Sequence, residues 1–297
     1  MGILRFLLAI SVVIAHSTSI FGFELVGGQI AVQAFFIISG FYMTLILNEK
    51  YIGANHSYRL FISNRALRLY PIYWVVLLLT ILYSGYLFIS SNGLKSGSFN
   101  PYISHFKDLN IGSLLFLTFT NIFLFFQDIV MFLGLDLQNG NLFFTQNFRN
   151  TKPMLFEFLF IPQAWTIGVE LLFYVIAPFL VRRKIYVIFS LIFCSILLRC
   201  FLYYGLDLKF DPWTARFFPT ELVFFLLGTL AYHVYKKYEK YNFKKRHLNL
   251  IWSSIVLLTV AYGFIEIQFK ELIYLIYFFA CLPFIFILTK NIRKMLI

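Results

Sequence analysis

The sequence predicts an all-α fold, a polytopic bundle of about 8–10 transmembrane helices. Of its 297 residues, 60% are hydrophobic and 13% are charged, whereas soluble domains are about half apolar and about a quarter charged. The mean hydropathy is +0.80, and Phe alone contributes 39 residues. A water-soluble core of this length cannot bury so much apolar surface, so soluble fold classes are excluded.

Nine apolar segments approach the length of about 20 residues that a helix needs to cross a bilayer. They lie near residues 3–22, 28–47, 71–90, 111–133, 162–181, 185–204, 217–236, 249–267 and 272–289. They leave no room for a soluble domain, so we expect a single membrane domain over residues 1–297. The first segment lacks a small-residue cleavage site and carries Arg5 and His16, so we expect it to remain as a span.

Basic residues predict the orientation of these spans, because Lys and Arg concentrate in cytoplasmic loops. Most of the 25 basic residues are Arg5 or lie in segments 48–70, 182–184, 236–246 and 290–294. Only Glu49 and Glu239 accompany them. We therefore expect these segments and both termini in the cytoplasm. This distribution explains the net charge of +12, so we expect no nucleic-acid partner.

The stretch between residues 70 and 162 does not fit simple alternation. Crossings at both 71–90 and 111–133 would return the chain to the cytoplasm too early and place the basic run 182–184 outside. An odd number of crossings is therefore needed. Either 111–133 is re-entrant or broken, or part of 141–161 completes another crossing, and the sequence leaves both options open.

Ionisable side chains inside spans are costly and indicate functional sites. On a helix, Arg5 and His16 would lie within about 20° of one face and about 16 Å apart. We expect Arg5 at the cytoplasmic end and His16 about halfway across. A long ligand with an anionic end would fit between them. The structural alternatives are a snorkelling Arg5 and a packed His16.

Two further sites carry charge. Glu170 could pair with His16 and hold its tautomer, or it could be a helix-start carboxylate favoured by the helix dipole. Arg65 and Arg68 are three residues apart and point one way on a helix. Two guanidiniums can bind phosphates, although an ordinary cytoplasmic anchor is the alternative. The three cysteines lie in apolar stretches without a metal or disulfide motif.

Four motifs in one order resemble the integral-membrane acyltransferases of acyltransferase family 3. Arg5 to His16 resembles the family's Arg-x10-His, and 34–41 (Ala-Phe-Phe-Ile-Ile-Ser-Gly-Phe) is similar to its Phe-Phe-x-x-Ser-Gly-Phe. Residues 65–71 (Arg-Ala-Leu-Arg-Leu-Tyr-Pro) resemble its Arg-x-x-Arg-aliphatic-x-Pro. Residues 165–174 resemble its Trp-Ser-Leu-Ser-Val-Glu…Phe-Tyr, with Thr166 and Gly168 in place of Ser. The resemblance covers residues 1 to about 181, and the rest matches by hydropathy.

The resemblance implies a multi-pass enzyme of a bacterial inner membrane that moves an acyl group, commonly acetyl, from cytoplasmic acyl-CoA to a hydroxyl of a cell-surface carbohydrate or glycolipid. Acyl-CoA is then a substrate, and we expect no bound cofactor and no metal. The guanidiniums of Arg5, Arg65 and Arg68 would hold the CoA phosphates. His16 would act as the general base or carry the acyl group itself, and Glu170 would orient His16 or contact the acceptor.

Four more residues are candidates with weaker support. Ser39, or an amide near Gly40, could stabilise the oxyanion, although Gly40 fits close helix packing better. Trp165 and Tyr174 are candidates for the acceptor site.

Two other interpretations stay open. A transporter or flippase of a glycan or lipid-linked precursor also uses buried Arg, His and Glu, although the sequence has no inverted repeat. An inactive family member is the second, because the family's usual closing Ser-Tyr-x-x-Tyr-Leu-x-His segment is not found, and residues 274–278 (Tyr-Leu-Ile-Tyr-Phe) lack its pattern.

Overall fold

The computed structural model describes residues 2–17, 24–51 and 57–295, with side chains described as far as residue 290. Most of this chain is helical, and the described strands are β1 (Leu133–Leu135) and β2 (Leu142–Phe144), which form one antiparallel hairpin. The predicted all-α fold is confirmed. The chain divides into two compact units, the first made of Met1–Gly53, Ala177–Leu197 and Glu221–Ile297, and the second of Ala54–Ile176 and Leu198–Thr220.

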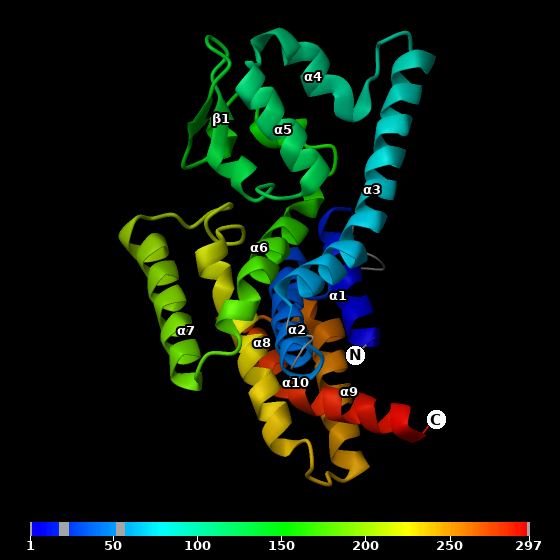
Figure 1. Cartoon of the computed structure of the whole chain (residues 1–297), viewed down its shortest axis with the longest axis vertical. Coiled ribbons are helices and arrows are strands. Elements are labelled where there is room, and N and C mark those ends of the chain that lie inside the picture. The colour runs from blue at the N-terminus through cyan, green and yellow to red at the C-terminus, as the bar shows by residue number, and fades with distance from the viewer. Residues whose placement is uncertain (1, 18–23, 52–56, 296–297) are drawn as a thin grey trace. The chain divides into compact units, whose positions relative to one another are not determined.

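The helices fall into these units as Figure 1 labels them. The first unit holds α1 (Gly2–Ala15), α2 (Gly28–Glu49), most of α7 (Ile185–Cys200), most of α8 (Phe218–Tyr238), α9 (Lys245–Ala261) and α10 (Lys270–Met295). The second unit holds α3 (Tyr58–Ser90), α4 (Asn100–His105), α5 (Ile111–Phe123), the hairpin and the first three turns of α6 (Trp165–Leu180).

Six helical segments of the described chain are long and apolar enough to cross a membrane. They are Gly28–Glu49, Tyr58–Ser90, Pro162–Leu180, Ile185–Gly205, Lys245–Phe264 and Lys270–Lys290. Three of the nine expected spans fall outside this set: α1 and α5 are short, with 14 and 13 residues, and α8 is long enough but more polar. Residues 18–22 of the first expected span lie outside the described residues. The predicted topology requires α8 and the first expected span, 3–22, of which α1 is the described helix, to cross as well, which would make eight spans.

The structure shows which option holds between residues 70 and 162. Helix α5 ends at Phe123, and the next residue, Leu124, has a φ of 64°. Its 13 residues measure about 20 Å, less than the ~30 Å of a bilayer core. The described residues of 141–161 form β2 and short 3₁₀ turns. Segment 111–133 is therefore broken, the alternative of a crossing within 141–161 is wrong, and α3 supplies the odd crossing.

Side chains of α3 explain how α5 can end inside this unit. The hydroxyl of Tyr70 donates to the carbonyl of Phe123 at 2.6 Å, and the indole of Trp74 donates to that of Ile122 at 2.9 Å. Tyr73 donates to the carbonyl of Asn121. The last carbonyls of a helix have no partner within it, and leaving them bare in an apolar setting is costly. Three aromatic side chains of α3 therefore cap the C-terminus of α5.

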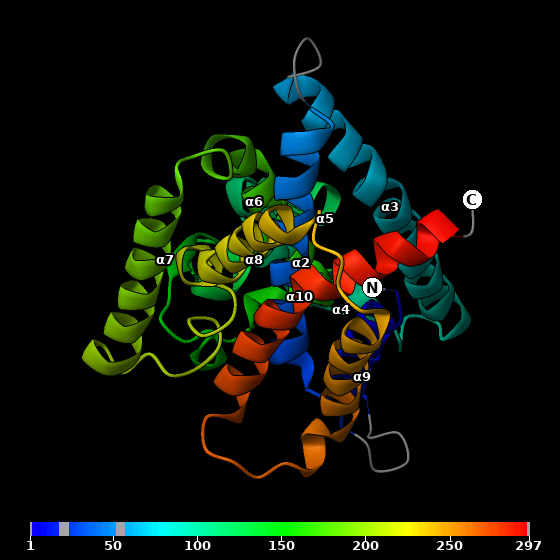
Figure 2. The ribbon, with the colours of Figure 1, turned by 90° about the horizontal axis from the view of Figure 1, so that it is seen from below.

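Helices α2 and α8 meet at backbone contact in the first unit. A Cβ at Gly40 would lie 1.9 Å from the carbonyl oxygen of Phe225, and a Cβ at Gly228 would lie 2.1 Å from that of Ile37. Only glycine permits such an approach at either position. Gly40 therefore allows close helix packing, one of the two roles that the sequence suggests for it. Figure 2 shows α2 and α8 lying together beside α10.

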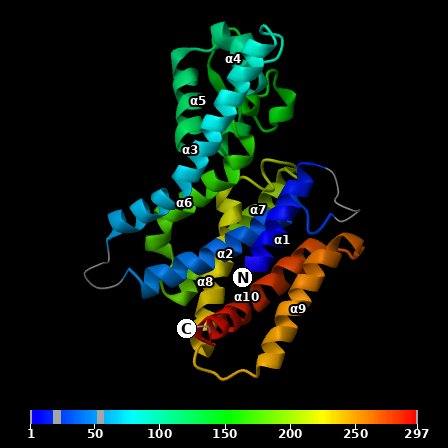
Figure 3. The same cartoon turned by 90° about the vertical axis from the view of Figure 1, so that its right-hand side faces the viewer.

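Polar and aromatic contacts hold the rest of the first unit. Across the α2–α8 crossing, the Thr44 hydroxyl donates to Thr229 at 2.9 Å. The Phe41 ring lies 4.9 Å from the ring of Phe286 on α10. Helices α9 and α10 form an antiparallel pair (Figure 3), joined by a hydrogen bond of 2.9 Å between the hydroxyls of Thr259 and Tyr274.

An ion network joins the ends of α2, α8 and α10. The Lys236 ammonium lies 3.0 Å from the Glu49 carboxylate and 2.8 Å from that of Glu239, and Lys290 lies 2.5 Å from Glu239. Glu49 and Glu239 are the two carboxylates that the sequence places among the cytoplasmic basic residues. Three segments predicted to share one side of the membrane therefore meet at one end of the unit.

Arg182 adds a fourth segment to this end. Its guanidinium donates to the carbonyls of Leu47 at 2.5 Å and Tyr51 at 2.7 Å, where α2 terminates. A cation is favourable at a helix C-terminus. Partial burial lowers the pKa of Arg182 from its ordinary value by desolvation. The basic run 182–184 thus lies with the other predicted cytoplasmic segments.

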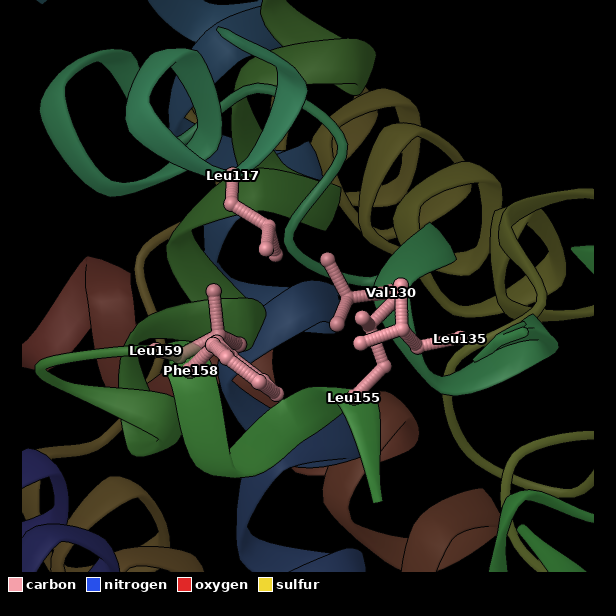
Figure 4. Close-up of a cluster of buried hydrophobic side chains, with 6 residues drawn as sticks. All are labelled: Leu117, Val130, Leu135, Leu155, Phe158 and Leu159. Atoms are coloured by element: carbon pink, nitrogen blue, oxygen red, sulfur yellow. The ribbon is translucent and has the colours of Figure 1, made fainter. Parts of the chain in front are cut away.

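The second unit has its own apolar core, built from α5, β1 and the 3₁₀ turn Leu155–Phe158 (Figure 4). Its buried members are Leu117, Val130, Leu135, Leu155, Phe158 and Leu159. Asn121 crosses this core, since its amide donates to the Phe158 carbonyl at 3.0 Å and accepts from the Phe160 amide at 2.8 Å. The core ties the segment after α5 to the segment before α6.

The segment that follows α7 packs on the hairpin region of the second unit. The Trp213 indole donates to the carbonyl of Gln146 at 2.9 Å, and its ring lies 4.9 Å from that of Phe132. Arg149 donates to the carbonyl of Asp211 at 3.3 Å. Both segments are predicted to be extracytoplasmic, and their contact agrees with that topology.

Candidate active site

The first helix carries Arg5, and His16 follows its last residue. Helix α1 ends at Ala15, and the backbone amide of His16 donates to the carbonyl of Val13 at 3.1 Å in the turn beyond it. Both side chains are exposed, while Leu4 and Leu8 of α1 are fully buried. His16 was expected within the helix, about halfway across. In the structure it lies at the helix end, accessible to a ligand.

The pairing of α1 with α2 places both residues along α2. A Cβ at Gly28 would lie 2.9 Å from the Cβ of Ala15, so the end of α1 meets the start of α2 (Figure 3). Arg5 lies about 15 Å along α1 from this meeting point, whereas Glu49 lies about 31 Å along α2. Because α1 is shorter than α2, Arg5 does not reach the end of α2 that carries Glu49. The sequence predicts Arg5 at that cytoplasmic end. His16 lies at the opposite end.

Arg65 and Arg68 lie in the first half of α3, which is helical from Tyr58 onward. The Nε of Arg65 is buried without a hydrogen-bond partner, and its guanidinium lies 6.0 Å from the Phe61 ring. Arg68 is exposed. Within the described chain, neither has a carboxylate within salt-bridge distance. Pro71 follows inside α3, which bends in its first half (Figure 1), as expected where a proline removes a helical hydrogen bond.

Glu170 lies on α6 one turn before Tyr174. The Tyr174 hydroxyl donates to the Glu170 carboxylate at 2.5 Å, and Tyr174 is only 6% exposed. This contact keeps one carboxylate oxygen in place and leaves the phenol ring packed. Two residues that the sequence singled out separately, as an orienting carboxylate and an acceptor contact, therefore act as one hydrogen-bonded pair.

Trp165, the first residue of α6, is covered by an arginine that sequence analysis did not single out. The Arg216 guanidinium lies 4.1 Å from the centre of the indole ring. Asp211 binds the same guanidinium through both oxygens, at 2.7 and 3.1 Å. One face of Trp165 is thus occupied. No sequence signal joined Arg216 to Trp165, because the two lie 51 residues apart in a loop and a helix.

Gly168, where the family usually has Ser, allows α6 to touch the turn after α5. A Cβ there would lie 2.8 Å from the carbonyl oxygen of Leu124 and 3.6 Å from the carboxylate of Asp128. Asp128 is 2% exposed, and its Oδ1 has no hydrogen-bond partner. Burial raises its pKa to about 6, although backbone hydrogen bonds and the nearby Arg216 charge act in the opposite direction.

Ser39 lies on α2, and the three cysteines lie on α7 and α10. Ser39 is buried on α2 next to Gly40, whose Cα faces α8. Cys194 and Cys200 are free and exposed, and Cys281 is free and buried. Within the described residues there is no group of three or more His, Cys, Asp or Glu that could hold a metal ion.

The structure divides the predicted site between its two units. Arg5, His16, Ser39 and Gly40 belong to the first, and the candidates on α3 and α6 belong to the second. Arg65 with Arg68, and Glu170 with Tyr174, are neighbours within the second unit. The pairing of His16 with Glu170 stays a prediction.

These features define a polytopic membrane protein with an accessible histidine and with two arginines on α3 that have no carboxylate partner among the described residues. A family model described as an acyltransferase domain matches residues 1–296. The chain therefore belongs to acyltransferase family 3 and is a membrane acyltransferase. The match confirms the predicted family and extends beyond residue 181, where the motif resemblance ended. No curated protein and no solved structure shows detectable similarity to the chain.

Proposed function

We propose that this enzyme transfers an acetyl group from cytoplasmic acyl-CoA to a hydroxyl of a cell-surface carbohydrate in the inner membrane. The family match supports acyl transfer over the transporter interpretation. The donor, the acyl group and the acceptor are our proposal, and they rest on the charges of the described residues together with the motifs.

The observation that carries the donor is the contrast between two sets of cations. Lys236, Lys290 and Arg182 are bound to carboxylates or helix-end carbonyls. Arg65 and Arg68 have no carboxylate partner in the described chain, and the Nε of Arg65 is a buried donor without an acceptor. Guanidiniums bind phosphates in a bidentate manner. The phosphates of CoA would supply the missing acceptors, and Arg5 would add a third cation.

His16 would supply the base. Its imidazole would accept the proton of the acceptor hydroxyl as that oxygen attacks the thioester carbonyl carbon. The C–S bond would then break, and the CoA thiolate would leave and take up the proton. An acyl-histidine intermediate is the alternative route. His16 lies near the first residue of α2, whereas the Glu49 network lies at its last residue, on the predicted cytoplasmic side. We therefore infer that transfer occurs toward the extracytoplasmic side.

Glu170 would assist as an anchored carboxylate. The hydrogen bond from Tyr174 restrains it, and the carboxylate would accept from the His16 imidazole or from the acceptor hydroxyl. A carboxylate that accepts from imidazole fixes the tautomer and stabilises the imidazolium that forms. Loss of Glu170 should therefore reduce the transfer rate more than it reduces CoA binding.

A radiolabel experiment tests the proposed transfer. Membranes containing the full chain receive labelled acetyl-CoA, and label in the envelope glycan fraction is counted. We expect His16→Ala to reduce transfer by at least about a hundredfold, the usual contribution of a positioned base. Label that persists in His16→Ala would contradict the assignment of the base.

A thermal-shift experiment with CoA tests the donor site separately, because a ligand that binds the folded state raises its melting temperature. We expect CoA to stabilise the wild type and His16→Ala, and to lose its effect in Arg65→Ala/Arg68→Ala. Arg59→Ala is the matched control, since Arg59 lies on the same helix about 120° from Arg65 and opposite Arg68. Equal shifts in all variants would remove the arginines from the donor site.

A further inference from the structure

The second unit contains a cavity that none of the residues above line. Its volume is about 420 Å³, and its walls include His105, Lys152 and Glu157 over an apolar floor of Leu137, Pro153 and Met154. Small-molecule sites span about 300–1,000 Å³, with an apolar lining and a few polar groups. The cavity lies in the stretch predicted to be extracytoplasmic.

His105 is oriented by a carboxylate. Its Nδ1 lies 2.9 Å from Oδ2 of Asp108, one helical turn further on. In the neutral imidazole, a proton on Nδ1 is donated to Asp108, which leaves Nε2 with a free lone pair. A histidine held in this tautomer accepts a hydrogen bond from a hydroxyl, so the cavity wall carries a defined acceptor.

The frame around the cavity is tightly packed. Leu155 and Phe158 are fully buried on one side of the 3₁₀ turn, which directs the exposed Glu157 away from the core. In the hairpin turn, a Cβ at Gly140 would lie 2.6 Å from the carbonyl oxygen of Asp108. The hairpin turn thus presses against the backbone that carries the Asp108 carboxylate.

The polar groups match a hydroxylated ring. His105 and Glu157 accept hydrogen bonds, and Lys152 donates them. The apolar floor suits the C–H face of a sugar. A purely anionic ligand would be repelled by Glu157, and a purely apolar one would form no hydrogen bond with any of the three polar groups.

We propose that this cavity is an acceptor subsite that binds one sugar unit of the carbohydrate acceptor, with His105 and Glu157 accepting hydrogen bonds from its hydroxyls. This inference rests on the proposed function for the identity of the ligand. Asp108 is a positioning residue, because it acts through the His105 ring.

Binding measured without the acyl donor tests the subsite. The probe is the de-O-acetylated envelope glycan, cleaved to short fragments, and its dissociation constant is measured by saturation-transfer NMR on the full chain in detergent. We expect His105→Gln and Glu157→Gln each to weaken binding about tenfold, the effect of one lost hydrogen bond to a fixed or charged group. His247→Gln is the matched control, an exposed histidine of the other unit.

Acetyl transfer is then measured in the same variants against glycan and acetyl-CoA concentration. The subsite predicts a higher half-saturating glycan concentration with an unchanged half-saturating acetyl-CoA concentration. If glycan binds and the variants weaken it while no variant transfers acetyl, the subsite stands and the transfer proposal fails. If transfer occurs with unchanged glycan dependence, or if wild type binds no glycan, the subsite is overturned.

Discussion

Residues of the candidate site are contacted by residues that are distant from them in the sequence. Gly168 contacts the turn at Leu124, and Trp165 lies under Arg216. The motif around residues 165–174 therefore does more than carry Glu170. It forms the surface by which α6 packs on the segment that follows α5, and this packing sets where the Glu170 carboxylate lies.

Gly168→Ala tests this packing. A methyl group would lie 2.8 Å from a carbonyl oxygen, and overpacking of this kind costs about 1–3 kcal/mol. We expect a lower thermal unfolding temperature in detergent and reduced acyl transfer. Gly85→Ala is the control, because its nearest neighbour would be 3.9 Å away. Equal unfolding temperatures for the two variants would show that the contact is not limiting.

Gly168→Ser separates packing from hydrogen bonding at the same position. The Ser hydroxyl would start beside the unpartnered Oδ1 of Asp128, 3.6 Å from the new Cβ. The hydrogen bond should offset part of the packing cost, by about 1 kcal/mol. We expect the unfolding temperature of Gly168→Ser to exceed that of Gly168→Ala. The difference should disappear when Asp128→Ala, which removes both acceptor oxygens, is combined with each variant.

In the first unit, the helices are held together by different contacts where they cross and where they end. The α2–α8 crossing depends on glycine, because small residues let backbones approach in a membrane, where no hydrophobic effect drives association. The ends of α2, α8 and α10 depend on charges. In the second unit, α5 depends on aromatic side chains of α3 that satisfy its last carbonyls.

Gly40→Ala and Gly228→Ala should each separate α2 from α8. The added Cβ would lie about 2 Å from a backbone carbonyl, which cannot move without shifting its helix. We expect a loss of about 2–3 kcal/mol, against a small gain for Gly85→Ala on α3 from helix propensity. Unfolding in detergent by tryptophan fluorescence measures both. A stable Gly228→Ala protein would contradict the crossing.

The Glu239 network predicts a dependence on pH. Hydrogen bonds from Lys236 and Lys290 lower the pKa of Glu239 from 4.5 to about 2. A lowered folded-state pKa contributes stability that is present above pH 4.5 and is lost as the pH falls toward 2. Glu239→Gln should therefore lower the unfolding temperature at pH 7 by on the order of 2 °C. The difference from wild type should shrink below pH 4.5, and Glu266→Gln should show neither effect.

At the scale of the whole molecule, the two units agree with one topology. The predicted cytoplasmic ends of α2, α8 and α10 meet through charges in the first unit. The predicted extracytoplasmic segments around Trp213 and the hairpin meet in the second. Each set of contacts requires its members to lie on one side of a membrane.

Cysteine labelling tests this topology. In a chain with its three native cysteines replaced by Ala, Lys240→Cys should react with an impermeant maleimide only after the membrane is opened. Gln138→Cys, in the exposed hairpin turn, should react from outside in intact cells. Both side chains are accessible in the structure, so failure to react would reflect sidedness. Labelling of Gln138→Cys only in opened membranes would place a second crossing between residues 70 and 162.

The sequence was sufficient to predict the fold class, the family, the approximate positions of most helices and the grouping of the basic segments, although α3 begins at Tyr58, 13 residues before the expected span 71–90. These properties depend on composition and local periodicity, which each segment carries within itself. The sequence left two options open that the structure shows: Arg65 and Arg68 lie in a helix, and segment 111–133 is broken.

Only the tertiary structure showed that α5 ends after 13 residues, that α1 is short and ends before His16, and that Gly40 meets Gly228. It also showed Arg216 on Trp165 and His105 in a cavity with Glu157. Each of these depends on contacts between residues far apart in the chain. Hydropathy measures whether a segment prefers lipid to water, and it holds no information about which neighbour will satisfy a carbonyl, cover a ring or orient an imidazole.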